Sequence, residues 1–479
     1  MRITQSIDLK KKDGFLFINA ILLMGFFTFL FLGTEYLYVT VISHMVSDNS
    51  AVLAQNYALG VSAIGFLLYF LLGYFDRKRA RAKDALFILI GLIALFCIAL
   101  ISMEMAYAIV FTAGLVLFLL LGLLGSAAFS VSMKLMVMDR YLARAVGISY
   151  ALGIMLQFIH NNLIRSELAK AIFLAVFLVL LVCLMIKNDG ICADCNREKT
   201  NNLEDIENSA GKNVRLGIVV GISLILLVAL MTCVFSTLDN AVTLVHSSGV
   251  MDIGQWPRIL LALSGISAGF VFDVKDRKYM GFVMYCVMLL STICIAVLKF
   301  SGPFLLGLVI FYLSAGFFAV FFTSGFLELS RHMKIPELWV CMGRAVNNIV
   351  AAVIANSVLI LLSFDNNLAF IVLVLVLFVA VSVAVALYMV QRKRFMESVD
   401  TVTEPVADKK DRLLELTEEF SFTDREKEVF QYLINTEDNI QTIADNMYVS
   451  RRTLERHISS IYAKTGVKSR VGLMNLYNR

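Results

Sequence analysis

Charged side chains are scarce in this chain, and their scarcity excludes a single water-soluble core. Asp, Glu, Lys and Arg make up 16% of the 479 residues, and 59% of the residues are hydrophobic. An ordinary soluble protein has roughly 25% charged residues. Proline occurs only four times, which excludes long proline-rich linkers. We therefore expect most of the chain to lie in a lipid bilayer.

The eight cysteines lack the pattern of a secreted disulfide framework. Most lie in apolar stretches, where cysteine behaves as a small hydrophobe. Cys192 and Cys195 have the spacing of half a zinc site or of a redox pair, but no second ligand pair lies nearby. Gly-rich phosphate loops, metal-spaced histidines and nucleophile–base pairs are also missing. We expect a protein that is not an enzyme and that needs no cofactor or metal.

Twelve apolar stretches approach the roughly 20 residues that a membrane-spanning helix needs. They fall into two groups of six, which predicts an all-α polytopic membrane bundle. The twelve stretches are 15–38, 58–75, 85–103, 110–137, 144–164, 168–187, 215–235, 258–272, 281–298, 303–327, 339–363 and 367–390.

Lysine and arginine fall on one set of the loops between these stretches. The opposite loops 39–57, 104–107 and 364–366 contain none. Because cytoplasmic loops carry the excess of positive charge, we expect both termini in the cytoplasm of a bacterial cell, and a multi-pass protein of its cytoplasmic membrane. Arg392 to Arg394 follow the last stretch and are expected either to lie against anionic headgroups or to be ordinary flanking charge.

The two groups of six also share a loop pattern at a nearly constant offset. Gly73, Asp76 and Arg77 follow the second stretch, and Gly269, Asp273, Arg277 and Lys278 follow the eighth. This pattern resembles the loop signature G-x-x-x-D-x-x-x-R-K of the major facilitator superfamily, although the first copy is one residue short. The resemblance covers roughly residues 14–390. It implies two six-helix bundles around a central cavity with a ligand site near the bilayer midplane.

A different pattern begins at residue 422, where apolar side chains recur at helical spacing in a polar sequence. Thr423 precedes three charged residues and has the features of a helix N-cap, as has Ser450 before a basic segment. A turn at Gly466 leads to Ser469, which is expected to cap a last helix. Four short helices with a basic third one predict a helix-turn-helix whose recognition helix covers about 450–464.

This segment resembles the LuxR-type C-terminal DNA-binding domain. The matching residues include Thr423, Arg425–Val429, Ile443-Ala444, Val449-Ser450, Thr453, His457, Ile461-Tyr462, Lys464, Gly466-Val467 and Ser469-Arg470. Asn435–Asn439 replace the usual glycine turn, and Glu455 stands where the family most often has a lysine. The resemblance implies double-stranded DNA as the partner and a homodimer through Val471, Met474 and Leu476. The expected DNA-binding residues are Ser450, Arg451, Arg452, Thr453, Glu455, Arg456, His457, Lys464, Lys468, Ser469 and Arg470.

Polar residues near the ends of corresponding stretches are candidates for binding an unknown small-molecule ligand, because ionisable groups in a membrane span are often functional. Glu35 and His44 follow the first apolar run, and Asp239 and His246 follow the seventh. His160 lies late in the fifth stretch. The alternatives are that these residues face water near the interface, or that they form hydrogen bonds between helices.

We therefore expect a membrane-bound one-component regulator, in which the membrane domain senses a small molecule or a membrane state and controls DNA binding. One alternative is a transporter of the major facilitator type with an autoregulatory DNA-binding tail, and another is a membrane tether without sensing. The expected parts are a cytoplasmic N-terminus (1–13), a first bundle (14–187), a central loop (188–213), a second bundle (214–390), a juxtamembrane linker (391–421) with a short helix at 408–419, and the DNA-binding domain (422–479).

Overall fold

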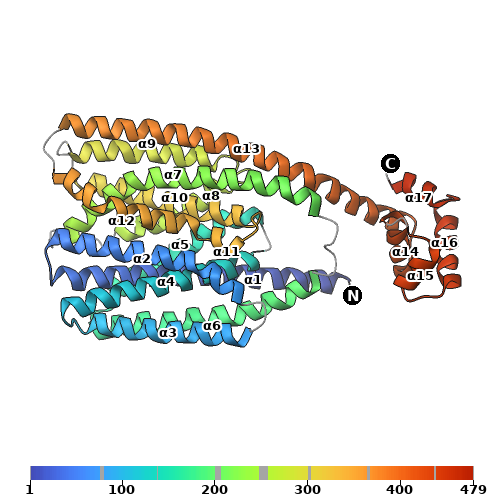
Figure 1. Ribbon diagram of the computed structural model, residues 1–479, viewed down its shortest axis with the longest axis horizontal. Helices are drawn as coiled ribbons and strands as arrows, with labels where there is room; N and C mark the ends of the chain where they lie inside the picture. The colour runs from blue at the N-terminus through green and yellow to red at the C-terminus, as the bar shows by residue number, and fades with distance from the viewer. Residues whose placement is uncertain are drawn as a thin grey trace. The chain divides into compact units, whose positions relative to one another are not determined.

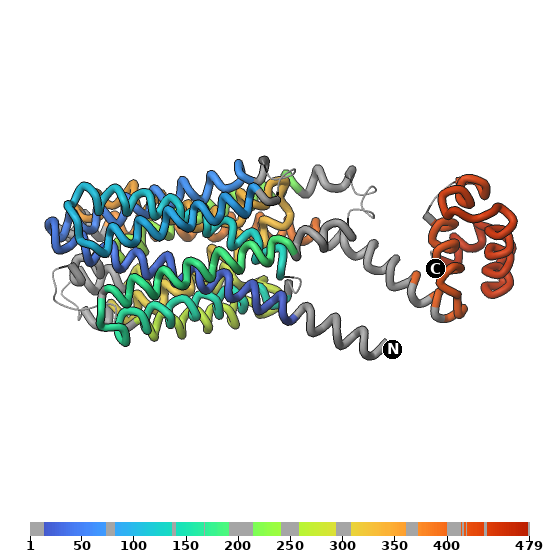
Figure 2. The backbone as a smooth tube through the Cα atoms, turned by 90° about the horizontal axis from the view of Figure 1, so that it is seen from below, coloured from blue at the N-terminus to red at the C-terminus, as the bar shows by residue number. Residues whose placement is uncertain are grey.

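The computed structural model describes residues 2–75, 80–136, 139–199, 207–247, 257–299, 304–363, 367–435 and 438–477, and these form helices and short connections without strands. It divides into two compact units, Met1–Phe395 and Met396–Arg479. The helices of the first unit run along a common direction (Figures 1 and 2).

The first half of the membrane unit contains six long helices. They are α1 (Arg2–Ser43), α2 (Asp48–Phe75), α3 (Ala80–Ser102), α4 (Tyr107–Leu135), α5 (Leu142–Asn162) and α6 (Glu167–Lys199). The second stretch was expected to begin at residue 58, but α2 begins at Asp48. Its first turns contain polar residues such as Gln55 and Asn56, which are buried inside the unit and therefore do not interrupt the helix.

The second half repeats this arrangement, with one short addition. Its helices are α7 (Glu207–Ser247), α8 (Pro257–Phe272), α9 (Met280–Lys299), α10 (Phe304–Ser330), α11 (Pro336–Trp339), α12 (Met342–Ser363) and α13 (Asn367–Glu419). The stretch expected at 339–363 thus begins at Met342, after the separate turn α11. Pro336 occupies the first position of that turn, where proline's missing N–H costs nothing.

The two halves meet along two helix pairs, α5 with α8 and α2 with α12. Glycine makes the first contact possible. A Cβ atom on Gly147 of α5 would collide with the carbonyl oxygen of Gly265 and approach Gly269 of α8. Small residues let membrane helices approach closely, because lipid-embedded helices associate mainly through packing and hydrogen bonds.

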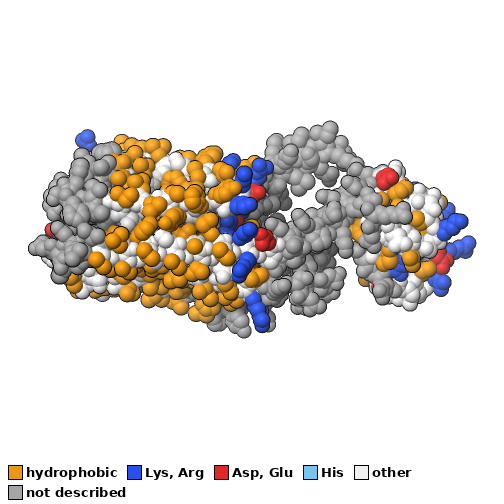
Figure 3. Space-filling model, turned by 90° about the horizontal axis from the view of Figure 1, so that it is seen from above, with side chains coloured by type: hydrophobic (Ala, Val, Ile, Leu, Met, Phe, Trp, Pro, Cys, Tyr) orange, Lys and Arg blue, Asp and Glu red, His pale blue; other side chains and the backbone are white. Residues whose placement is uncertain are grey.

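The surface of the membrane unit fits a bilayer. Ten described helices are long and apolar enough to span a membrane by length and composition, and α8 and α9 are shorter apolar helices. On the face in Figure 3, hydrophobic side chains cover the flank of the unit, and Lys and Arg gather at one end of it. This distribution confirms a multi-pass membrane bundle.

Helix α13 is longer than the last predicted stretch. It continues from Asn367 to Glu419, so the short helix predicted at 408–419 joins the last span without a break. Glu, Lys, Leu and Arg are frequent between residues 391 and 419, and they are good helix formers. The extent of this helix was therefore underestimated.

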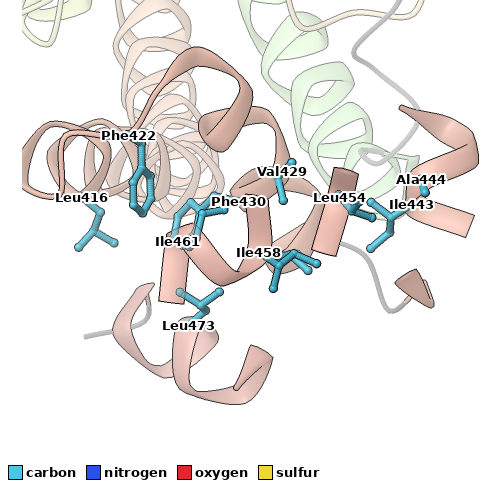
Figure 4. Packing of buried hydrophobic residues seen from close by; sticks show 11 residues of the cluster. Leu416, Phe422, Val429, Phe430, Ile443, Ala444, Leu454, Ile458, Ile461 and Leu473 are labelled. Carbon is cyan, nitrogen blue, oxygen red and sulfur yellow. The ribbon is translucent and has the colours of Figure 1, made fainter. Parts of the chain in front are cut away.

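The second unit contains the four short helices that the sequence predicts. They are α14 (Asp424–Asn435), α15 (Ile440–Asn446), α16 (Arg451–Thr465) and α17 (Arg470–Tyr477). They enclose a separate hydrophobic core, shown in Figure 4, which includes Leu416 from the end of α13. Since every helix contributes to this core, the unit has the interior that an independently folding domain needs.

Candidate DNA-binding surface and interior polar clusters

Side-chain caps fix the ends of the helix-turn-helix. Asn439 caps α15 by accepting a hydrogen bond from the backbone N–H of Thr442, and Ser450 caps α16 by accepting one from that of Thr453. Helix α16 ends at Gly466, whose φ of 72° lies in the left-handed region that glycine adopts without strain. Residues 451–465 are therefore held as one rigid helix, close to the predicted 450–464.

Helix α16 has one buried face and one basic face. Leu454, Ile458 and Ile461 are buried in the core, and His457 is half-buried. The remaining predicted DNA-binding residues of its first two turns are exposed: Arg451, Arg452, Thr453, Glu455 and Arg456. Such an exposed N-terminal part is what a recognition helix presents to the major groove.

Glu455 already has a partner on this face. Its Oε1 lies 2.9 Å from Nε of Arg451, one turn earlier. Arg452 and Arg456 form no ion pair among the described residues. These two arginines are consequently the residues on the exposed face whose guanidinium groups are available for phosphates or guanine edges.

Two other predicted DNA-binding residues hold the domain together. Nζ of Lys464 lies 2.6 Å from Oε2 of Glu426 and 3.0 Å from the backbone oxygen of Ser421. Arg470 donates to the backbone oxygens of Leu433, at 2.8 Å, and Asp438, at 2.6 Å. Lys468 and Ser469 are exposed, and their contact with DNA stays a prediction.

Glu426 is the buried centre of a polar network between α14 and α16. Its carboxylate accepts hydrogen bonds from the N–H of Thr423 at 2.7 Å, from Oγ of Ser460 at 2.6 Å and from Lys464. Burial alone would raise the pKa of this carboxyl, but the hydrogen bonds from Lys464, Ser460 and Thr423 outweigh burial and lower the pKa to about 2. Thr423 and Glu426 also form a reciprocal capping box at the start of α14.

The residues expected to form a dimer lie on α17. The side chain of Val471 is 66% exposed, whereas Met474 and Leu476 are half-buried, and Leu476 packs against the domain's own core. The homodimer therefore stays a prediction, with Val471 as its most accessible residue.

In the membrane unit, the structure brings two of the five ligand candidates together. Glu35 accepts a hydrogen bond from Nε2 of Gln55 at 2.7 Å and interacts electrostatically with Asp239 across the two halves. Next to them, Nδ2 of Asn56 donates to Oδ1 of Asn240 at 3.0 Å. These corresponding positions of α1 and α7 thus share one interior polar cluster.

The three histidines lie elsewhere. His44 is exposed just after the end of α1. His160 is buried within the first half, with its ring 5.9 Å from that of Phe29 and 6.1 Å from that of Phe173. The side chain of His246, like those of Cys192 and Cys195 and the loop residues Asp76–Arg79, lies outside the described residues.

Arg344 is an interior charge that the sequence interpretation missed as a candidate. Arg344 is the third residue of α12, as Arg144 is the third residue of α5. Its guanidinium carbon lies 5.4 Å from the ring centre of Phe31 in the first half and 5.8 Å from that of Phe322 in the second. One turn later, Asn348 donates to Oγ of Ser62 at 2.9 Å. In the sequence, the only indication of the role of Arg344 was a basic residue near the start of an apolar stretch.

A second interior cluster, the Asp273–Arg392 network, connects loop, span and last helix. Nε of Arg277 lies 3.0 Å from Oε1 of Glu328, and Nη2 of Arg392 lies 3.0 Å from Oε2 of the same carboxylate. Asp273 interacts with Arg277 and accepts hydrogen bonds from two backbone N–H groups at the start of α5. Arg392 is only 9% exposed, so the expectation that it lies against lipid headgroups was wrong. The buried carboxylate of Glu328 holds it inside.

Comparison with known proteins agrees with this geometry. The family described as "Bacterial regulatory proteins, luxR family" matches residues 420–477. Those residues form a LuxR-type helix-turn-helix domain, which implies DNA binding. A sequence search of the curated proteins found no match.

Solved structures resemble the membrane unit. A bacterial homologue of the iron transporter ferroportin, in the outward-facing state with soaked iron, has a TM-score of 0.52 at 15% identity over 79% of this chain and 99% of that one. Another structure of a bacterial homologue of ferroportin in the outward-facing state has a TM-score of 0.50 at 14% identity over 80% of this chain and 99% of that one. An auto-inhibited peptide transporter of the POT family gives 0.49 at 10% identity over 80% and 96%. The two structures of ferroportin homologues show that the membrane unit has a transporter-like fold, and the chain joins that fold to a LuxR-type DNA-binding domain.

Proposed function

We propose that this protein is a membrane-bound transcription regulator of a bacterial cell, whose transporter-like domain senses a small molecule or a membrane state. One observation carries the proposal. Helix α13 contains both Arg392, buried in the Asp273–Arg392 network, and Leu416, buried in the core of the DNA-binding domain. A single continuous helix therefore contributes to both interiors.

The Asp273–Arg392 network is placed to pass a change in the membrane unit on to α13. Asp273 binds the start of α5 in the first half, while Arg277, Glu328 and Arg392 lie in the second. A change in how the halves meet would therefore alter contacts on α13 itself. A ligand shifts such an equilibrium only if its affinity for the two states differs. On this proposal the termini are cytoplasmic and the DNA-binding domain acts as a dimer.

The first experiment measures DNA binding by residues 408–479 across a salt series, with DNA from upstream of the protein's own gene. Selective binding that is lost in Arg452→Ala/Arg456→Ala but kept in Arg425→Ala supports the regulator. Arg425 is the control because it is exposed on α14 and paired with Glu428. Binding that is uniform on every DNA, or unchanged in the double variant, contradicts it.

The second experiment tests sensing. The membrane unit is replaced by an unrelated membrane anchor, and promoter activity is followed in cells while growth conditions vary. Loss of regulation with retained DNA binding supports a sensing role, whereas unchanged regulation means that the unit is only a tether.

A transporter with an autoregulatory tail is the second candidate. Arg344, Glu35 and Asp239 favour it, since ionisable residues inside a membrane bundle mark pathways for substrates, ions or protons. Uptake of a candidate solute into vesicles that contain the full chain, abolished by Arg344→Gln, would establish this activity.

A further inference from the structure

Arg344 lies between the two halves without a carboxylate partner. It forms no ion pair within 4 Å among the described residues, and its guanidinium instead contacts the rings of Phe31 and Phe322. It also lines a small pocket together with Phe129, Cys341 and Gly343. A charge inside a membrane protein is costly unless an opposite charge compensates it. In the described part of the chain, Arg344 therefore lacks an anion in direct contact with its guanidinium.

Glu35, in turn, lacks a cation in direct contact with its carboxylate within the part of the chain that the structure describes. It lies one helical turn after Phe31 on α1, on the side of the helix that Arg344 approaches. Its carboxylate accepts a hydrogen bond from Gln55, and no cation lies within 4 Å of it among the described residues. Glu35 and Arg344 interact electrostatically but remain too far apart to form an ion pair.

Neighbouring amides also retain unused hydrogen-bonding capacity. Gln55 donates to Glu35, while its own Oε1 is buried without a partner among the described residues. Asn240 accepts from Asn56, while its Nδ2 is buried without one. Both residues are more than nine-tenths buried, at 6% and 1% exposure. A buried polar group left unpaired is unfavourable, so these atoms indicate space for a polar ligand.

We propose that the space between the two halves binds a small zwitterion, whose anionic group pairs with Arg344 and whose cationic group pairs with Glu35. This assignment deepens the proposed function by naming the class of ligand, and it rests on the membrane unit binding one. The phenyl rings of Phe31 and Phe322 hold the guanidinium by cation–π contacts and shield it from water, which strengthens its attraction for an anion.

The charges of the site favour a zwitterion over a simple ion. An anion alone would leave Glu35 uncompensated and would be repelled by both Glu35 and Asp239. A cation alone would leave Arg344 uncompensated and would be repelled by Arg258. Arg258 interacts electrostatically with both Asp239 and Glu35, and Glu35 also interacts with Arg344, so the two acids and the two arginines form one group of charges that a ligand carrying both signs of charge matches.

The test uses the full chain in lipid nanodiscs. Its thermal unfolding and its heat of binding are measured with the α-amino acids that have uncharged side chains, with β-alanine and with γ-aminobutyrate, each added separately. Every compound is compared with its N-acetyl derivative, which keeps only the negative charge, and its methyl ester, which keeps only the positive charge. We expect at least one free zwitterion to bind, and both of its derivatives to bind about tenfold more weakly or worse, since each has lost an ion pair.

Variants locate the site. Arg344→Gln and Glu35→Gln should each weaken binding of the free zwitterion at least about tenfold. Arg344→Lys should keep part of the affinity, because lysine retains the positive charge but cannot donate the two parallel hydrogen bonds of a guanidinium. Lys187→Gln is the matched control, because it removes a cation that contacts a single ring, Phe15, at the exposed surface. It should bind normally.

Three results would overturn the proposal: no binding by any free zwitterion, equal binding by a derivative, or unchanged affinity in both glutamine variants. The comparison among wild-type ligands remains decisive even if a variant fails to fold. DNA binding by residues 408–479 is measured separately, so failure of ligand binding and failure of the regulator are distinguishable.

Discussion

Replacing Glu426 by Gln should destabilise the DNA-binding domain strongly at neutral pH. The carboxylate is 4% exposed and pairs with Lys464 at 2.6 Å. Its pKa falls from the ordinary 4.5 to about 2 in the folded domain. Since one pKa unit corresponds to about 1.4 kcal/mol, the folded state favours the ionised form by about 3 kcal/mol, which is an upper bound on the loss. Gln keeps the size but not the charge, and we expect a loss of about 2–3 kcal/mol.

The pH dependence has a definite sign. Because the pKa of Glu426 is lower in the folded state, its stabilisation is fully present above the unfolded pKa of about 4.5. It is lost as the pH falls towards about 2, where the carboxyl is protonated in both states. The free energy of unfolding of the wild-type domain should therefore decrease between about pH 5 and 2. Glu426→Gln should show a smaller decrease, so that the two proteins converge in acid.

The measurement is urea unfolding of residues 408–479, followed by circular dichroism at several pH values. Glu428→Gln is the control on the same helix, since Glu428 pairs with Arg425 at 2.7 Å but its side chain is 50% exposed. Exposed pairs contribute roughly 0–1 kcal/mol, so the control should change little. Equal losses in the two variants, or parallel pH curves for wild type and Glu426→Gln, would refute the assigned role of the Glu426 network.

Four further changes have expected outcomes. Arg392→Gln removes one partner of a buried carboxylate and should cost about 3–5 kcal/mol, seen as a lower midpoint of thermal unfolding of the full chain in nanodiscs, whereas the exposed Arg394→Gln should not. Gly466→Ala forces a Cβ into the left-handed region and should cost about 1 kcal/mol in urea unfolding of residues 408–479. Gly147→Ala places a Cβ against the carbonyl oxygen of Gly265 and should lower the unfolding temperature of the full chain, while Gly190→Ala, which meets no atom within 4 Å, should not. Val471→Asp should abolish dimer formation in sedimentation experiments while leaving the helical content unchanged, because the side chain is exposed in the single chain.

The two domains could be predicted from the sequence for different physical reasons. Spanning helices are recognisable because the bilayer requires long apolar stretches, and every predicted stretch overlaps a described helix. The DNA-binding domain is recognisable because its caps are local: Thr423, Ser450 and Gly466 act on their own helix ends. Each cap acts on residues that are close to it in the chain, so it can be recognised from a single sequence.

Contacts between distant residues could not be predicted in this way. Lys464 and Arg470 looked like DNA-binding residues because they are basic, but their partners Glu426 and Leu433 lie more than thirty residues away in the chain. Arg392 looked like a flanking charge because Glu328, which holds it, is 64 positions earlier. Glu35 and Asp239 were chosen as candidates because they occupy corresponding places in the two halves. Because the two halves repeat the same arrangement, corresponding residues were predicted together.

The energies of these interior contacts bear on whether the membrane unit could regulate DNA binding at all. A tenfold change in DNA occupancy requires about 1.4 kcal/mol of coupling. Breaking a buried ion pair such as Arg392 with Glu328 costs about 3–5 kcal/mol, so a state in which this pair is only partly weakened already supplies enough. A zwitterion at Glu35 and Arg344 would contact α1 and α12, on opposite sides of the boundary between the halves, and Asp273 crosses the same boundary to α5. The proposed ligand site and the Asp273–Arg392 network therefore both depend on how the two halves meet. For this reason the ligand response of Arg392→Gln in promoter assays should be lost even if the ligand still binds.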